Sequence, residues 1–141
     1  MKRYLGLDLG TKTCGVALTD KSNTFVFPHQ TIHFDKEDYE NAFNQIKDIV
    51  EKEKITDIVI GLPKNMDGSL GFASQRSLNF VEYLKGLNIN VTTFDERLSS
   101  VEAQRILHDN NLKSRDFKDK VDMQAAAIIL ESYLRSLTND K

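Results

Sequence analysis

The sequence predicts an α/β fold, a five-stranded mixed sheet flanked by helices, and three observations predict it. Residues 4–20 alternate apolar with small or polar side chains around a glycine turn, a pattern typical of two antiparallel strands. A third strand-like segment at residues 24–32 extends this into an antiparallel meander of strands 1–3. Two further strands follow, each preceded by a helical segment, and such crossovers join parallel strands.

The first hairpin places one carboxylate at its bend. Leu5, Leu7 and Leu9 lie at alternate positions, and Asp8 stands among them just before the Gly10 turn. An aspartate is uncommon inside a strand and costly to bury unpaired. Asp8 is therefore interpreted either as part of a metal or phosphate site or as a turn residue that bonds the amides of the Gly10 turn.

The next two elements are an edge strand and an amphipathic helix. Residues 25–27 are apolar and β-prone, and Pro28 follows them. Because proline cannot donate a hydrogen bond to a sheet, this strand is expected at an edge. From Tyr39 onward apolar residues recur on one helical face, and Asp35 is the expected cap of that helix.

A strand–helix–strand unit comes next. Residues 58–60 form a continuous apolar run, which is typical of a parallel strand buried on both faces. Residues 62–71 contain proline, asparagine and an Asp-Gly pair, so they predict a structured loop at the carboxyl end of that strand, where open sheets bind ligands. Helical spacing returns at residues 72–87, and residues 90–94 alternate as the fifth strand.

Charged residues stand where the fifth strand ends. Residues 95–97 read Asp-Glu-Arg and place a second carboxylate, Glu96, at a strand end. Ser99 and Glu102, three positions apart, are typical of a capping box that opens a short helix through Leu107.

The end of the chain combines a basic segment with a helix. Residues 110–120 show no periodicity and are predicted to form a mobile, locally basic loop. Its basic residues are Lys113, Arg115, Lys118 and Lys120. The last helix is expected over residues 121–137, with Asp122 in its first turn. Considered alone, Asp122 there is most simply a favourable charge at a helix N-terminus.

Composition limits the class of protein. The 141 residues fit a single domain spanning 1–141, with 40% hydrophobic and 28% charged residues. No apolar run is long enough to cross a membrane, and the first residues do not form a signal peptide, so a cytoplasmic protein is expected. The single cysteine, Cys14, is interpreted as a small buried side chain rather than a nucleophile. Because the net charge is −2, any contact with nucleic acid must be local or metal-assisted.

Three carboxylates stand at element ends that a mixed sheet can bring together: Asp8, Glu96 and Asp122. Placed close together they repel one another, which is costly unless a divalent cation neutralises them. Oxygen-only ligands indicate Mg²⁺ or Mn²⁺. The histidines His29, His33 and His108 have no zinc-site spacing and are interpreted as surface or packing residues. Two ions bridged by a carboxylate would suit phosphodiester hydrolysis, which is nuclease chemistry.

Four segments, in this order along the chain, carry a resemblance to a known family: LGLDLGTKTCGVALTD, GLPKNMDGS, DERLSS and DMQAAAIIL. Together they resemble the YqgF family, also called RuvX, within the RNase H-like superfamily. The resemblance implies an RNase H-like fold similar to RuvC-type resolvases, and a metal-dependent endonuclease that matures the 5′ end of pre-16S rRNA.

The resemblance also implies roles for particular residues. The catalytic and metal-binding positions correspond to Asp8, Glu96 and Asp122. Supporting positions correspond to Asn65, Asp67 and Arg97. One departure from the family pattern is Thr13, which stands after Lys12 where a second basic residue is common. Phosphate contact at Lys12 is then weaker or supplied elsewhere, and the basic residues of 110–120 are candidates for it.

Each supporting residue also has a structural interpretation. Asn65 and Asp67 suit a loop turn, which for Asp67 with Gly68 is the simpler reading. Arg97 is interpreted either as a partner of an adjacent carboxylate or as a guanidinium that grips phosphate. The lysines of 110–120 are most simply solvated surface residues, and their position before Asp122 makes substrate contact the alternative.

Other functions remain as alternatives. The hairpin also resembles the phosphate-binding turn of actin-like ATPases and sugar kinases, but those enzymes close two such domains over ATP and the DERLSS segment has no place in them. A non-catalytic nucleic-acid-binding module would not need all three carboxylates. A Holliday junction resolvase acting on four-way DNA works as a symmetric dimer. No exposed apolar stripe is evident, so a monomer or weak homodimer acting on pre-rRNA is expected, with branched DNA as the alternative substrate.

Overall fold

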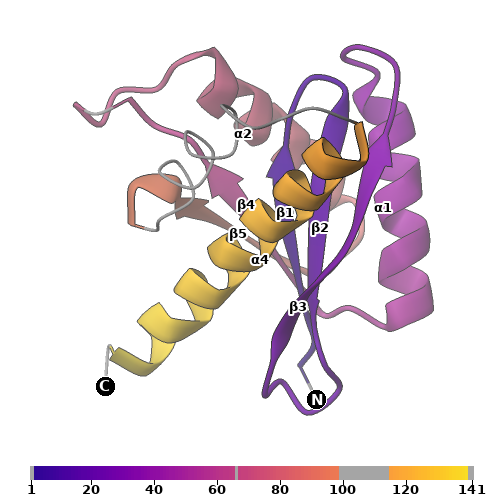
Figure 1. Ribbon diagram of the computed structural model, residues 1–141, viewed down its shortest axis with the longest axis vertical. Coiled ribbons are helices and arrows are strands. Elements are labelled where there is room, and N and C mark those ends of the chain that lie inside the picture. The colour runs from indigo at the N-terminus through magenta and orange to yellow at the C-terminus, as the bar shows by residue number, and fades with distance from the viewer. Residues whose placement is uncertain (1, 66, 99–114, 140–141) are drawn as a thin grey trace.

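The structure is a computed structural model that describes residues 2–65, 67–98 and 115–139, and its core is one five-stranded sheet (Figure 1). The strands are β1 (Tyr4–Leu9), β2 (Thr13–Thr19), β3 (Val26–His33), β4 (Asp57–Leu62) and β5 (Asn90–Asp95). The helices are α1 (Tyr39–Glu53), α2 (Phe72–Lys85), the short 3₁₀ helix η1 (Glu96–Leu98) and α4 (Arg115–Asn139).

The sheet has the strand order β3-β2-β1-β4-β5. β1 pairs antiparallel with β2 and β2 with β3, whereas β4 pairs parallel with β1 and β5 with β4. The predicted mixed sheet is therefore confirmed, with β1 at its centre. This order places the carboxyl ends of β1, β4 and β5 at one edge of the sheet, where ligands bind in open α/β sheets.

The two faces of the sheet are covered by different helices. Leu5 and Leu7 of β1 belong to the core that α1 and α2 cover, together with Ile46 of α1 and Phe80 of α2. Tyr4 belongs to the second core, under α4. Because side chains alternate along a strand, Gly6 and Asp8 lie on the α4 face with Tyr4.

Helix α4 lies very close to the sheet because two strands present glycines beneath it (Figure 1). A β-carbon on Gly15 would lie 2.0 Å from the carbonyl oxygen of Asp122, and one on Gly6 would lie 2.9 Å from that of Ala126. Neither distance is possible for a real side chain, so only glycine allows this contact. Ala125 and Ala126 keep the helix side of the contact equally small.

The edge strand β3 is as the sequence predicts. Pro28 lies within β3, and β3 pairs only with β2 in the described sheet. Proline has no amide hydrogen to donate, and at an edge strand this disturbs hydrogen bonding to one neighbouring strand at most. The register shifts between Val16 and Ala17 of β2, which pair with Gln30 and Pro28. His29 is the extra residue at this bulge.

The start of α1 differs from the expectation. Asp38, not Asp35, is the residue before the helix, and its side chain accepts a hydrogen bond from the Asn41 amide at 3.2 Å. The backbone carbonyl of Asp35 accepts a bond from the Asp38 amide at 2.8 Å, so Asp35 begins a tight turn that leads into the helix.

The start of α4 also corrects the prediction. Residues 115–120 are helical rather than a loop, so the last helix begins six residues before Val121. Two hydrogen bonds connect the first turns of α4 to β3. The Thr31 hydroxyl donates to the Asp119 carbonyl at 2.6 Å, and His33 Nε2 is hydrogen-bonded to the Asp119 carboxylate at 2.9 Å. Apolar residues recur every fourth position here, at Phe117, Val121 and Ala125, as they do on one face of a helix. The charged residues between them make this period hard to recognise in the sequence.

Several predictions concern residues outside the described ranges. These are the Ser99–Glu102 capping box, the short helix through Leu107, His108 and Lys113. In the described ranges, no helix is both long and apolar enough to cross a bilayer.

The contact between Gly15 and α4 predicts a large stability effect. Gly15→Ala should lower the free energy of unfolding by about 1–3 kcal/mol, because the new methyl group must push α4 away from β2. Gly71→Ala is the comparison variant, since its β-carbon would lie 3.5 Å from the nearest atom. Gly71 is the N-cap of α2, so its replacement by alanine should cost no more than about 1 kcal/mol. Urea denaturation measures both, and equal losses in the two variants would contradict the close contact.

Candidate functional site

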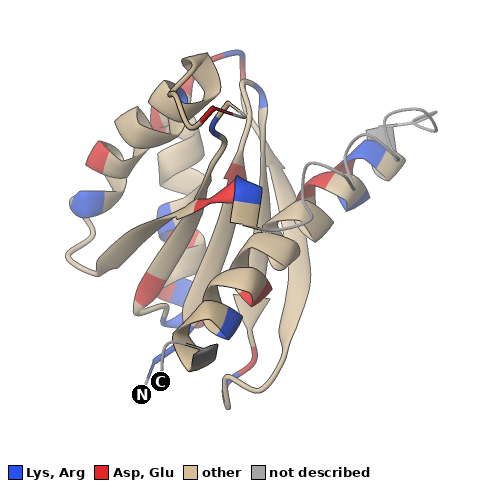
Figure 2. Cartoon of the chain, turned by 90° about the vertical axis from the view of Figure 1, so that its left-hand side faces the viewer, with Lys and Arg blue, Asp and Glu red and all other residues tan. Residues whose placement is uncertain are grey.

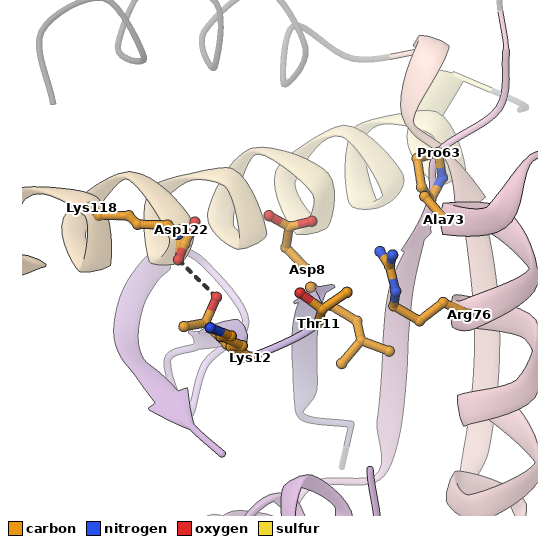
Figure 3. Close-up of a pocket in the computed structure, with 11 residues that line it drawn as sticks. Asp8, Thr11, Lys12, Pro63, Ala73, Arg76, Lys118 and Asp122 are labelled. Carbon is orange, nitrogen blue, oxygen red and sulfur yellow. Dashed lines mark hydrogen bonds between the residues drawn. The ribbon is translucent and has the colours of Figure 1, made fainter. Parts of the chain in front are cut away.

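A cavity of about 390 Å³ opens at the carboxyl end of β1 (Figure 3). Four parts of the chain form its wall: the end of β1 with the turn into β2, the residue after β4, helix α2, and helix α4. The lining residues are Asp8, Leu9, Gly10, Thr11, Lys12, Thr13, Pro63, Ala73, Arg76, Lys118 and Asp122. Two acidic and three basic side chains therefore surround one polar hollow.

Asp8 is one of the two acidic residues that line this cavity. Its strand is central in the sheet, and the residue is only 8% exposed. Asp8 pairs across the sheet with Gly15, so the space beside it on β2 carries no side chain. The Asp8 side chain points to the α4 face and into the cavity (Figure 3). A residue larger than Gly15 would cover Asp8 on this face.

Asp122 comes to the same cavity from α4. The backbone carbonyl of Asp122 is the group that lies against Gly15, and Gly15 is the cross-strand partner of Asp8. The Thr13 hydroxyl donates to Asp122 Oδ2 at 3.1 Å (Figure 3). Asp122 is the eighth residue of its helix, not a first-turn residue, so the interpretation as a helix N-terminal charge is wrong.

Glu96 occupies the other side of β1. It is 5% exposed and begins η1, directly after β5. A β-carbon on Gly61 of β4 would lie 3.1 Å from the Glu96 carboxylate and 2.6 Å from Ile129 of α4. Glycines on both neighbours of β1 thus make room for the other two acidic residues, Gly15 for Asp122 and Gly61 for Glu96.

These acidic residues do not form a ready-made metal cluster. Across the ranges that the structure describes, no group of three or more His, Cys, Asp or Glu side chains has the arrangement of a metal site. Asp8 and Asp122 share the cavity, while Glu96 lies outside its lining. The available donors are carboxylate and hydroxyl oxygens, which match the ligand chemistry of a hard divalent cation.

The basic side chains at the cavity come from three different elements. Lys12 lies in the turn after β1, Arg76 in α2 and Lys118 in α4 (Figure 3). Elsewhere in the described chain Lys and Arg positions are interspersed with Asp and Glu positions (Figure 2). Positive charge at the site is therefore local, as the net charge of −2 predicts.

Arg76 is a site residue that the sequence analysis missed. Its helix follows the loop at the carboxyl end of β4, and that connection brings the first turns of α2 to the cavity. Arg76 stands outside all four motif segments. Its place in the helix that follows the β4 loop was the only feature of the sequence that could have indicated it.

Asn65 and Asp67 shape the loop before α2. The Asp67 carboxylate accepts hydrogen bonds from the Ser69 hydroxyl at 2.6 Å and the Ser69 amide at 2.9 Å, and these hold the Asp67 pKa below its usual value. The Asn65 side-chain amide donates to the Ser69 hydroxyl at 3.0 Å. Neither residue lines the cavity, so the turn interpretation describes the structure.

Arg97 makes the carboxylate pairing that was one of its two interpretations. Its guanidinium donates to Asp95 through Nε at 3.1 Å and Nη2 at 2.8 Å, and its backbone amide donates to Asp95 Oδ1 at 2.9 Å. These bonds lower the Asp95 pKa. Lys64 lies 3.9 Å from the same carboxylate, so Asp95 links the end of β5 to the loop after β4.

Among the basic residues of 110–120 that the structure describes, one lines the cavity and another does not. Lys118 lines it, whereas Lys120 is exposed and lies outside the lining. The backbone of Arg115 begins α4, and Lys113 is outside the described residues. Cys14 is fully buried, which confirms its interpretation, and burial raises the pKa of its thiol well above the usual value.

Comparison with known proteins identifies close relatives. The RuvX family model, described as Holliday junction resolvase, matches residues 2–136. A protein of Thermoanaerobacter pseudethanolicus assigned as a pre-16S rRNA nuclease is 40% identical over 139 residues, covering 97% of this chain and 99% of that protein. A Lactobacillus gasseri protein with the same assignment is 41% identical and covers 99% of both.

Among solved structures, T. thermophilus RuvC in complex with Holliday junction substrate aligns with a TM-score of 0.61. Sequence identity is 9%, and the alignment covers 98% of both chains. At that identity the likeness concerns the fold, and it confirms the predicted RNase H-like architecture.

The Asp95–Arg97 pair predicts a pH-dependent contribution to stability. Because the Asp95 pKa is lowered by folding, its carboxylate stabilises the protein above the usual pKa of about 3.9. That contribution is lost as the pH falls through the lower folded value. At pH 6 the wild type should exceed Asp95→Asn in free energy of unfolding by up to about 1 kcal/mol, as for exposed pairs. The difference should vanish on acidification.

Urea denaturation at several pH values measures this difference. The control repeats the comparison in an Arg97→Gln background, where Asp95→Asn should have a smaller effect because the guanidinium is gone and only the residue 97 amide and Lys64 still contact the carboxylate. A difference between wild type and Asp95→Asn that stays constant down to the most acidic pH would contradict the pairing.

Proposed function

Because the chain belongs to the RuvX family, we propose that it is a metal-dependent endonuclease that matures the 5′ end of pre-16S rRNA. The observation that carries the proposal is the cavity where Asp8 and Asp122 face Lys12, Arg76 and Lys118. A phosphodiester needs both kinds of group, since basic side chains bind its charge and carboxylates hold the cation that activates it.

Asp8, Asp122 and Glu96 are the proposed ligands of that cation. Their oxygen atoms fit Mg²⁺ or Mn²⁺, and the glycines beside Asp8 leave space that larger residues would fill. Two such ions, when bound, would stabilise the attacking and leaving oxygens of the scissile phosphate. The Thr13 hydroxyl orients Asp122 through the bond to Oδ2.

The basic side chains position the strand. Lys12, Arg76 and Lys118 surround the carboxylates from three sides, so a phosphate entering the cavity is held by one or more of them (Figure 3). Arg97 remains a candidate for a flanking phosphate, although its pairing with Asp95 restricts how far it can turn. We propose that Asn65 acts through the shape of the loop rather than by touching substrate.

A Holliday junction resolvase is the second candidate, because the family model carries that description. Two cuts related by a two-fold axis require a dimer with two sites at fixed spacing. We propose instead a monomer or weak homodimer, since the large exposed apolar side chains of the described residues are scattered over several elements rather than gathered in one stripe.

The proposed ligand role of Asp8 gives a mutational prediction. Asp8→Asn should reduce magnesium-dependent cleavage of a precursor rRNA segment to background. Its stability without metal should be unchanged or slightly higher, because one of two neighbouring carboxylates loses its charge. Asp57→Asn is the matched control: Asp57 is also 8% exposed but lies at the start of β4, at the opposite end of the sheet, and should retain cleavage. Full activity of Asp8→Asn would refute the role.

The substrate is tested by a side-by-side assay. A precursor 16S rRNA 5′ segment and a synthetic four-way DNA junction are incubated with the protein in Mg²⁺, with Glu96→Gln as the inactive control. We expect cleavage of the RNA near the mature 5′ end and little cutting of the junction. Symmetric paired nicks in the junction, with the RNA intact, would instead support the resolvase.

A further inference from the structure

The most exposed large apolar side chain in the described part of the chain lies beside the cavity. Phe72 is 94% exposed and is the first residue of α2. Single exposed apolar residues are common on protein surfaces and need no explanation by themselves. Phe72 differs because the next residue, Ala73, lines the cavity that contains Asp8 and Asp122.

Phe72 also shares a helical face with Arg76. The two residues are four apart in α2, so their side chains are neighbours on the helix surface. Long helical side chains lean toward the helix N-terminus, which directs the Arg76 stem toward the turn that carries Phe72. Figure 3 shows Arg76 and Ala73 at the cavity wall formed by α2. Phe72 comes directly before Ala73 in the same helix, so it adjoins this wall.

An exposed ring beside a guanidinium is suited to a nucleotide. The base stacks on the aromatic face while the guanidinium binds the phosphate next to it, which is how many proteins hold single strands. In a duplex both faces of a base are already stacked on neighbouring bases, so such a ring favours an unpaired base. Leu70 and Leu98 are also exposed, by 52% and 71%, but they have no π face to offer.

We propose that Phe72 is a stacking platform for an unpaired base of the substrate strand, adjacent to a phosphate that Arg76 contacts. The proposal rests on the nuclease function above and specifies its substrate as single-stranded at this position. An acidic protein gains from this arrangement, because stacking adds affinity without requiring a broad positive surface.

The test measures binding of a short single-stranded RNA that carries one fluorescent 2-aminopurine. It is carried out in an Asp8→Asn background and without divalent cation, so that the strand stays intact even if Asp8 is not catalytic. Phe72→Ala should weaken binding by roughly 5- to 150-fold, the range expected for one stacked base. It should also abolish the fluorescence quenching that stacking causes. Phe72→Trp should retain both signals, and Phe72→Leu should behave like Phe72→Ala.

The matched control is Phe25→Ala. Phe25 is 70% exposed but lies in the turn between β2 and β3, at the end of the sheet opposite to the cavity, and its loss should leave binding unchanged (Figure 1). Wild-type affinity in Phe72→Ala would overturn the proposal. So would wild-type affinity in Phe72→Leu, which would indicate a general apolar contact instead of stacking.

The same variants separate this proposal from the nuclease function. If Asp8→Asn retains cleavage while Phe72→Ala loses stacking and affinity, the platform stands and the catalytic assignment fails. If Asp8→Asn loses cleavage while Phe72→Ala binds and quenches as the wild type does, the platform alone fails.

Discussion

The close contact of α4 with glycines of the sheet is the constraint on which the rest of the structure depends. A helix normally stands off a sheet by the thickness of the side chains between them, but Gly6 and Gly15 remove that thickness. The helix then crosses β2 and β1 with its own backbone against the strands. Any β-carbon at Gly15 would displace the backbone of Asp122, so the position of this carboxylate depends on a residue that has no side chain.

The same absence of side chains explains why acidic groups can gather at β1. One helical turn advances about 5.4 Å, and two strand residues advance about 6.6 Å, so a helix seated at Gly6 through Ala126 brings Asp122 near Asp8. Gly61 provides equivalent space for Glu96 on β4. Packing of Ile129 and Leu130 in the second core holds α4 in place, and this burial opposes the repulsion between the carboxylates.

Much of this could be predicted from the sequence. The alternation in β1 and β2 is local and specifies both the hairpin and the face on which Asp8 lies. The beginning of α4 was missed because Asp119 and the lysines around it mask a weak apolar period, and its helical state is supported by contacts with β3 that lie 86 and 88 residues away in sequence. Arg76 was missed for a related reason: only the path of the chain after β4 brings it to the site, and no local pattern marks that path. Asp35 and Asp38 are both good caps, and the turn between them decides which one is used.

The placement of charge follows from the same geometry. A chain with net charge −2 gains little from long-range attraction to nucleic acid, so its affinity must come from groups that touch the strand. Here the basic groups come from three separate elements, and each meets the cavity only because the sheet edge brings those elements together. Without a cation, the two carboxylates offset part of the attraction of Lys12, Arg76 and Lys118 for phosphate. A bound divalent ion would reverse that balance, so under the proposed function we infer that such an ion would promote substrate binding as well as cleavage.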